Sequence, residues 1–285
     1  MISREAALQL YEPSSSNITM SAASTLPIPG SSSETGNARF NAEAANWDSN
    51  PFVNTASKHA CKALLQRFPA LSKENPALDI LEIGCGTGLL TFMLAPYARS
   101  ITAVDASRGM VDVLNRKIEK GGVENVEGIC VLLEDPEDQA LPPARDADPE
   151  AVANGATAKR MKYDLITSHL VLHHIPDLEG MLKTMWGCLK EGGWVALTDF
   201  EDEGPQSRAF HPKSKMGGVS RDGIGREYME EVMRGVGFQD VKVEAGWSME
   251  KRVERWEGEF GNRGKGEEGE GIVREFPFVC CLGGR

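Results

Sequence analysis

Apolar residues recur along this chain in two rhythms, and each rhythm predicts a different kind of secondary structure. Spacings of three and four residues are typical of an amphipathic helix, whereas short, nearly continuous apolar runs are typical of buried strands. The first pattern predicts helices at 54–68, 89–98, 110–118, 178–189 and 225–236. The second predicts strands at 78–85, 100–106, 129–135, 163–172, 194–200, 240–247 and 276–284.

Strands and helices that alternate in this way predict the fold class. We expect an α/β protein with a doubly wound, seven-stranded, mostly parallel sheet and helices on both faces. Residues 1–38 are rich in serine and proline and have little periodicity, so they are predicted to be a disordered tail. Residues 39–285 are then one domain, with surface insertions at 143–160 and 257–271.

Composition narrows the range of partners. The 285 residues carry a net charge of −11 and contain no block dense in lysine or arginine, which argues against a nucleic-acid partner. No apolar run reaches the length of a bilayer span, so we expect no membrane partner. The six cysteines lack CxxC spacing, which predicts free thiols in a reducing, cytoplasmic compartment and no metal site.

A cluster of glycines follows the first predicted strand, in the segment LEIGCGTG. In sheets of this kind, ligands bind outside the carboxyl ends of the strands, and the first turn approaches them closely. The dinucleotide-binding pattern GxGxxG would need a glycine at position 89, but that residue is Leu89. The third glycine, Gly88, comes one residue early, and this counts against a nicotinamide-dependent dehydrogenase.

Acidic residues at the ends of the next two strands complete the pattern. Asp105 ends the second predicted strand, where a carboxylate can accept hydrogen bonds from both hydroxyls of a ribose. The third predicted strand ends in LLEDPED, within reach of an adenine amino group, and the fourth ends in SHLVLHHIPD. Glycines, a ribose acid and an adenine acid in this order predict a ligand that contains adenosine.

At these residues the chain resembles the class I S-adenosylmethionine-dependent methyltransferases of the small-molecule type. LEIGCGTG resembles their first motif and AVDAS their second, while YDLITSHLVLHHIPD and LKEGGWVALTDF are similar to their fourth and fifth strands. FNAEAANWDSNP resembles the N-terminal segment that covers the cofactor in many members. The resemblance spans residues 40–284 and implies a Rossmann-like fold and S-adenosyl-L-methionine as cofactor.

The resemblance also implies a role for individual residues. The glycine turn would line the methionine end of the cofactor, Asp105 would hold the ribose, and Trp47 would help close the site. Glu134 competes with Asp135 for the contact with the adenine. The implied cofactor-binding residues are Trp47, Glu82, Gly84, Cys85, Gly86, Gly88, Asp105, Ala106, Ser107, Met110, Asp135, Pro136 and Ser168.

The implied activity is methyl transfer to the hydroxyl, amine or activated carbon of a small molecule by in-line displacement. The cofactor supplies the reactivity, and a base is needed only where the acceptor must lose a proton. His173, His169 and His174 stand where such a base would lie, with His173 first, although a packing role is the alternative. Other functions left open are a protein methyltransferase and a non-catalytic subunit that binds the cofactor.

Overall fold

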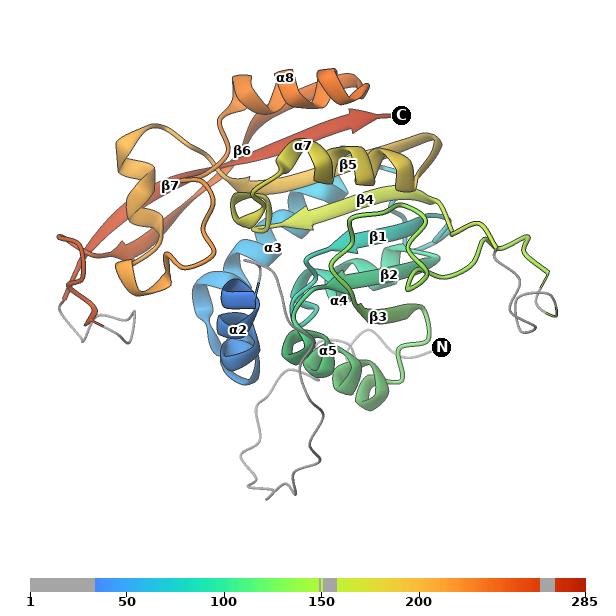
Figure 1. The fold of residues 1–285 in the computed structure, drawn as a ribbon, viewed down its shortest axis with the longest axis horizontal. Coiled ribbons are helices and arrows are strands. Elements are labelled where there is room, and N and C mark those ends of the chain that lie inside the picture. Colours follow the sequence, from blue (N-terminus) through green and yellow to red (C-terminus); the bar gives the residue numbers. More distant parts are fainter. Residues whose placement is uncertain (1–33, 149, 151–157, 262–269) are drawn as a thin grey trace.

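The protein is described by a computed structural model that covers residues 34–148, 150, 158–261 and 270–285. Within these residues, seven strands form one sheet in the order β3-β2-β1-β4-β5-β7-β6 (Figure 1). The strands are β1 (Asp79–Ile83), β2 (Ser100–Asp105), β3 (Val126–Cys130), β4 (Tyr163–His169), β5 (Leu189–Phe200), β6 (Gln239–Val253) and β7 (Ile272–Gly284). The first five strands are parallel and β7 runs antiparallel to both of its neighbours. The predicted doubly wound, mostly parallel sheet is confirmed.

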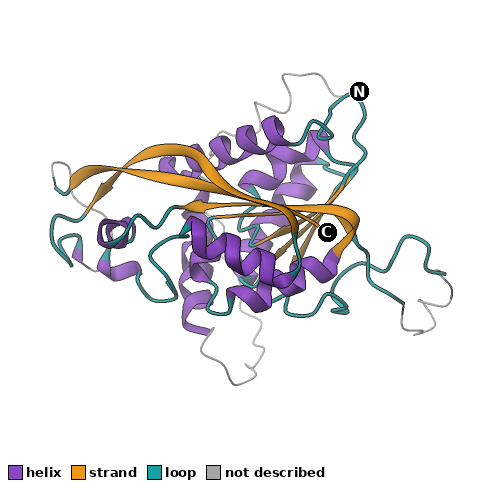
Figure 2. Cartoon of the chain, turned by 90° about the horizontal axis from the view of Figure 1, so that it is seen from above, coloured by secondary structure: helices purple, strands orange, loops and turns teal. Residues whose placement is uncertain are grey.

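Helices cover both faces of the sheet (Figure 2). The described α-helices are α2 (Glu34–Glu43), α3 (Pro51–Arg67), α4 (Leu89–Leu94), α5 (Arg108–Gly121), α7 (Leu178–Cys188) and α8 (Arg226–Val236). Short 3-10 helices are η1 (Ala44–Ser49), η2 (Ala95–Tyr97), η3 (Leu172–His174), η4 (Pro205–Phe210) and η5 (Lys213–Lys215). One apolar cluster joins α7 and α8 to the sheet, and another joins α3, α4 and α5 to it.

Local signals explain why α3 and α5 begin where they do. The Asn50 side chain accepts a hydrogen bond from the backbone N–H of Phe52, and Pro51 occupies the first position of α3. The Ser107 side chain caps α5 in the same way by accepting from the backbone N–H of Met110. Because β2 ends at Asp105, this cap begins α5 directly beside the carboxyl end of the sheet.

The third strand is shorter than the sequence predicted. The apolar pattern placed it at 129–135, but β3 occupies Val126–Cys130. Its last paired residue, Cys130, lies opposite Asp105, the last residue of β2. The backbone N–H of Val131 still donates to the carbonyl of Asp105 at 3.0 Å, and β2 ends at that residue, so the chain then leaves the sheet.

The last two strands are longer than predicted, and the fourth is shorter. β6 extends as far as Val253, and β7 already begins at Ile272. The added residues of the two strands pair with one another and include charged residues without hydrophobic alternation. β4 ends at His169 because Leu170 adopts a positive φ of 58°, which turns the chain out of the sheet. The fifth strand begins at Leu189 rather than at residue 194.

The N-terminal boundary also differs from the sequence prediction. α2 begins at Glu34, so the last five residues of the predicted tail, 34–38, are helical. The remainder of that tail, and parts of both predicted insertions, lie outside the described residues. No helix among the described residues is both long enough and apolar enough to cross a membrane.

Candidate functional site

A cavity of about 1990 Å³ lies at the carboxyl ends of the parallel strands. The glycine turn after β1, the end of β2 and the residues after β4 all contribute to its lining. So do the N-terminal elements α2 and η1, and parts of the segments 209–220 and 248–253. One cavity therefore contains both the predicted cofactor-binding turn and the predicted histidines.

The glycine turn provides an open, backbone-lined surface inside this cavity. Gly84 and Gly86 have positive φ values of 73° and 55°, which favour glycine. A Cβ at Gly84 would lie 2.3 Å from the Cγ2 of Val171, so a side chain there would clash. At Gly86 the nearest atom to such a Cβ is the indole nitrogen of Trp47, 3.9 Å away. This space beside Gly86 is what a closely bound ligand requires.

Asp105 is fixed next to the glycine turn by two backbone hydrogen bonds. One carboxylate oxygen accepts from the N–H of Gly86 and the other from that of Ser107, both at 2.8 Å. Burial raises the pKa of this carboxyl, and the two backbone hydrogen bonds oppose the rise. The same carboxylate lines the cavity beside Ala106 and Met110, so its remaining lone pairs are available to ribose hydroxyls.

Glu82 is a second buried acid on the lining of the cavity. Its side chain is 2% exposed, and Oε2 accepts a hydrogen bond of 2.6 Å from the hydroxyl of Thr91. Burial and, to a lesser extent, the charge of Asp105 raise its pKa to about 8, against the opposing effect of the Thr91 hydrogen bond. A buried carboxyl with a raised pKa next to a second acid favours a cationic ligand group.

The residues implied by the resemblance divide into two sets. Those that line the cavity are Trp47, Glu82, Gly84, Cys85, Gly86, Asp105, Ala106 and Met110. Those outside its lining are Gly88, Ser107, Asp135, Pro136 and Ser168. The second set has structural contacts instead: for example, the Ser168 hydroxyl donates to the carbonyl of Ile83 at 2.7 Å.

The two acids that the resemblance implied as candidates for the adenine contact differ in their position relative to the cavity. Glu134 lines the cavity, whereas Asp135 does not. A carboxylate oxygen of Asp135 accepts instead from the backbone N–H of Glu137 at 2.8 Å, in a local turn. Pro136 lies against Gly187 of α7, because a Cβ on that glycine would be 2.7 Å from the proline ring. Of the two acids considered, Glu134 is the one at the cavity.

The N-terminal elements are held onto the glycine turn and α5 by polar contacts. The Asn41 amide oxygen accepts from the Ser107 hydroxyl at 2.9 Å and from the backbone N–H of Gly109 at 2.7 Å. The Asp48 carboxylate accepts from the Thr87 hydroxyl at 2.5 Å and pairs with the Lys117 ammonium group at 2.8 Å. These contacts hold η1, with Trp47, against the cavity.

His173 forms a buried pair with Asp199. Its Nδ1 lies 2.8 Å and 3.0 Å from the two carboxylate oxygens of Asp199, and its backbone N–H also donates to that carboxylate. Burial opposes ionisation of Asp199, but the charge and hydrogen bonds of His173 hold the pKa of that carboxyl below its usual range. The other ring nitrogen of His173, Nε2, is buried and has no hydrogen-bond partner among the described residues.

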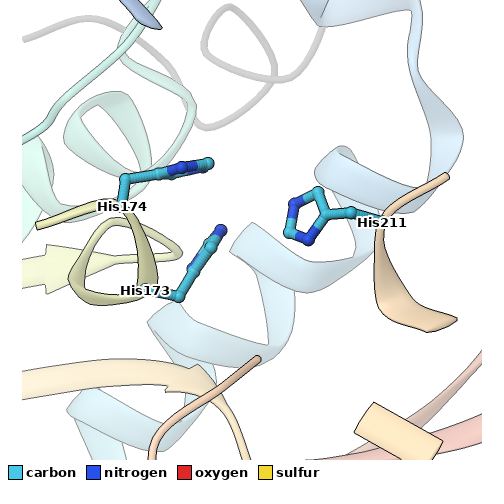
Figure 3. A group of neighbouring side chains, drawn as sticks. All are labelled: His173, His174 and His211. Carbon is cyan, nitrogen blue, oxygen red and sulfur yellow. The ribbon is translucent and has the colours of Figure 1, made fainter. Parts of the chain in front are cut away.

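The other histidines near His173 are neutral at pH 7. Burial lowers the pKa of His169 to about 4 and, with the charge of His173, that of His174 to about 3. Burial likewise lowers the pKa of His211 well below its ordinary value. The rings of His173, His174 and His211 face one another across the cavity (Figure 3). His169 also lines the cavity, and its Nδ1 is hydrogen-bonded to the Thr198 hydroxyl at 2.9 Å.

Sequence reasoning missed several of these residues. Asp199 stands at the carboxyl end of the fifth strand, in WVALTDF, where a polar residue ending an apolar run is a usable signal. His211 lies in a segment without periodicity, and nothing local connects it to His173. Asn41 and Asp48 belong to the resembling segment FNAEAANWDSNP, but their contacts are visible only in the structure.

The fold and the site together define a class of protein. A seven-stranded sheet in this order, with only β7 antiparallel and with the cavity at the glycine turn, is the fold of class I methyltransferases. The YcgJ protein of Bacillus subtilis has a similar fold, with a TM-score of 0.57 at 15% identity, over 80% of this chain and 98% of that protein.

Comparison of sequences shows the family. Residues 53–243 match the model of the methyltransferase domain family, and the chain belongs to that family. An uncharacterised methyltransferase of Schizosaccharomyces pombe is 25% identical over 58% of this chain and 55% of its own length. A malonyl-[acyl-carrier protein] O-methyltransferase of Acetivibrio thermocellus is 32% identical over 56% of this chain and 47% of its own. The matches thus span about half the length of these curated relatives.

Proposed function

We propose that this protein transfers a methyl group from S-adenosylmethionine to a small-molecule acceptor bound beside His173. The observation that carries the proposal is the single cavity, which joins the glycine turn and Asp105 at one end to the His173–Asp199 pair at the other. The O-methyltransferase activity in the name of the Acetivibrio relative supports an oxygen nucleophile in the acceptor.

The residues at the turn suit this cofactor. Asp105 would accept from the ribose hydroxyls, the space beside Gly86 would admit the methionine end, and Glu82 would face its positive charge. When bound, S-adenosylmethionine supplies an electrophilic methyl group on a positively charged sulfur. The protein then has to align the acceptor and exclude water, and both are served by α2 and η1 along the cavity.

His173 would take up the proton that the acceptor loses. In the neutral ring, the hydrogen that Nδ1 donates to the Asp199 carboxylate leaves the lone pair on Nε2. Nε2 is buried, has no hydrogen-bond partner in the part of the chain that the structure describes, and belongs to a residue that lines the cavity. A hydroxyl acceptor placed there would donate its proton to Nε2, which would make its oxygen more nucleophilic.

The test combines an acceptor search with matched variants. The protein is incubated with methyl-labelled S-adenosylmethionine and with cell extract separated into small-molecule and macromolecular fractions, and labelled products are identified by mass spectrometry. Label in the small-molecule fraction is expected, whereas label confined to macromolecules would contradict the proposed acceptor class.

On the acceptor so identified, His173→Ala should lower kcat by ~10²–10⁴ with nearly unchanged cofactor affinity. His59→Ala is the control, because His59 lines the same cavity but stacks on Trp247 and does not belong to the group of His173, His174 and His211. An undiminished kcat in His173→Ala would remove the proton-accepting role and leave alignment as the only contribution of this part of the site.

A further inference from the structure

Three histidines from separate parts of the chain direct ring nitrogens toward one point of the cavity. One ligand nitrogen from each of His173, His174 and His211 lies within 4.8 Å of the others. Two of these residues belong to η3, after β4, and the third directly follows η4, after β5 (Figure 3). Local spacing does not reveal this group, which is why the sequence predicted no metal site.

Hydrogen bonds fix which nitrogen of two of the rings keeps a lone pair. His173 donates through Nδ1 to the carboxylate of Asp199. His174 donates through Nδ1 to the backbone carbonyl of Gly218 at 2.7 Å, and a carbonyl can only accept. In the neutral form of both rings, Nε2 is therefore the nitrogen with the lone pair. An imidazole held by a carboxylate or a carbonyl at its other nitrogen is the usual arrangement of a metal-binding histidine.

We propose that His173, His174 and His211 bind a divalent zinc ion, with the remaining coordination position open to the cavity. Three histidines and one open position form a common ligand set for catalytic zinc. Zinc–nitrogen bonds of ~2.0–2.1 Å in tetrahedral geometry place the nitrogens ~3.4 Å apart. Binding thus requires the most distant pair of nitrogens, up to 4.8 Å apart, to draw together by about 1.4 Å.

The proposal goes beyond methyl transfer, because it names how the acceptor is held and activated. A hydroxyl or thiol of the acceptor would take the open position as a metal–heteroatom bond forms, and its proton would pass to water. In the zinc-bound protein, Nε2 of His173 coordinates the ion, so coordination replaces proton transfer to that nitrogen.

A buried lysine beside the group offers a test of charge. The Lys251 ammonium group donates to the carbonyl of Phe210 at 2.7 Å and lies 3.6 Å from the centre of that ring, next to His211. Arg39 is a second cation near His174 and His211. Burial lowers the pKa of Lys251 to about 7, so at pH 6 the side chain is charged and opposes a bound dication, and Lys251→Met should tighten zinc binding at that pH.

The experiment titrates the full-length protein, free of cofactor and acceptor, with Co²⁺ and then displaces the Co²⁺ with Zn²⁺. One equivalent is expected, with visible absorption typical of tetrahedral nitrogen and oxygen ligands and without the near-ultraviolet band of cysteine thiolates. His211→Ala should remove this spectrum, and Asp199→Asn should weaken Zn²⁺ binding about 10–100-fold. His59→Ala should bind as the wild type does.

The metal titration contains neither cofactor nor acceptor. A negative result would therefore overturn the zinc site without contradicting the proposed methyl transfer. His211 is only half-buried, so His211→Ala should fold, and circular dichroism checks that it does. Absence of binding, or an unchanged spectrum in folded His211→Ala, would overturn the zinc site. A thiolate band would also overturn the zinc site, because it would place the ion on cysteine. Weaker zinc binding in Lys251→Met would overturn it as well.

Discussion

Cofactor binding should release a proton from Glu82, and Glu82→Gln should abolish that release. In the free protein, burial raises the pKa of Glu82 to about 8. At pH 7 a carboxyl with that pKa is roughly 90% protonated. A cofactor that brings positive charge beside it favours the ionised form, so the proton leaves on binding.

The size of the effect follows from the same pKa. Ionising Glu82 at pH 7 costs about 1.4 kcal/mol, which is a tenfold reduction in apparent affinity. Cofactor affinity should therefore rise about tenfold between pH 6 and pH 7 and level off above pH 8. Glutamine resembles the protonated carboxyl in shape but cannot ionise, so the affinity of Glu82→Gln should show no such rise.

Calorimetry measures this proton directly. Titrations with S-adenosylmethionine in two buffers of different ionisation enthalpy give the number of protons released, expected to be ~0.9 at pH 7 for the wild type. The matched control is Glu134→Gln, which removes an exposed acid from the lining of the same cavity. Equal proton release in the wild type and in Glu82→Gln would refute the reasoning.

The sign of the pKa shift also predicts how stability depends on pH. Between the ordinary pKa of a glutamate and about 8, folded Glu82 holds a proton that the unfolded chain has released. The unfolding free energy of the cofactor-free protein should therefore fall as pH rises through this window. In Glu82→Gln this part of the decline should be absent, as thermal melts from pH 5 to pH 8 would show.

Two further predictions concern the cofactor end of the cavity. Asp105→Asn should weaken S-adenosylmethionine binding by ~10–100-fold in calorimetry, because it removes the charge from the acceptor offered to the ribose; unchanged affinity would exclude that role. Asp48→Asn should loosen η1 by weakening the contacts with Thr87 and Lys117. We expect faster hydrogen exchange at Trp47 and weaker cofactor binding, with little change in Tm; protection equal to wild type would show that these contacts do not hold η1.

The sequence by itself determined the fold class and the location of the cofactor-binding turn. Buried parallel strands are recognisable because both faces are covered and the runs are therefore apolar throughout. Parallel strands also place their carboxyl ends at one edge, so the glycine turn and Asp105 could be expected to meet. These features are local, or follow from strand order, and the hydrogen bond from Gly86 to Asp105 agrees with them.

Strand ends and the choice between neighbouring acids required the tertiary structure. The apolar run at 129–135 continues past Cys130, but pairing stops there because β2 has ended. That termination leaves Glu134 at the cavity and turns Asp135 away. A hydrophobic pattern indicates which residues are buried, but it does not indicate whether a neighbouring strand is present to pair with them.

The histidine group is the part of the site that only tertiary structure decided. His173 meets Asp199 because β4 and β5 are adjacent, and it meets His211 because the chain after β5 folds back over the cavity. The last of these contacts has no signal in local spacing, since it depends on the path of an irregular segment. Such a path is set by long-range packing, including the stacked rings of Phe200 and Phe210, rather than by the periodicity of the segment itself.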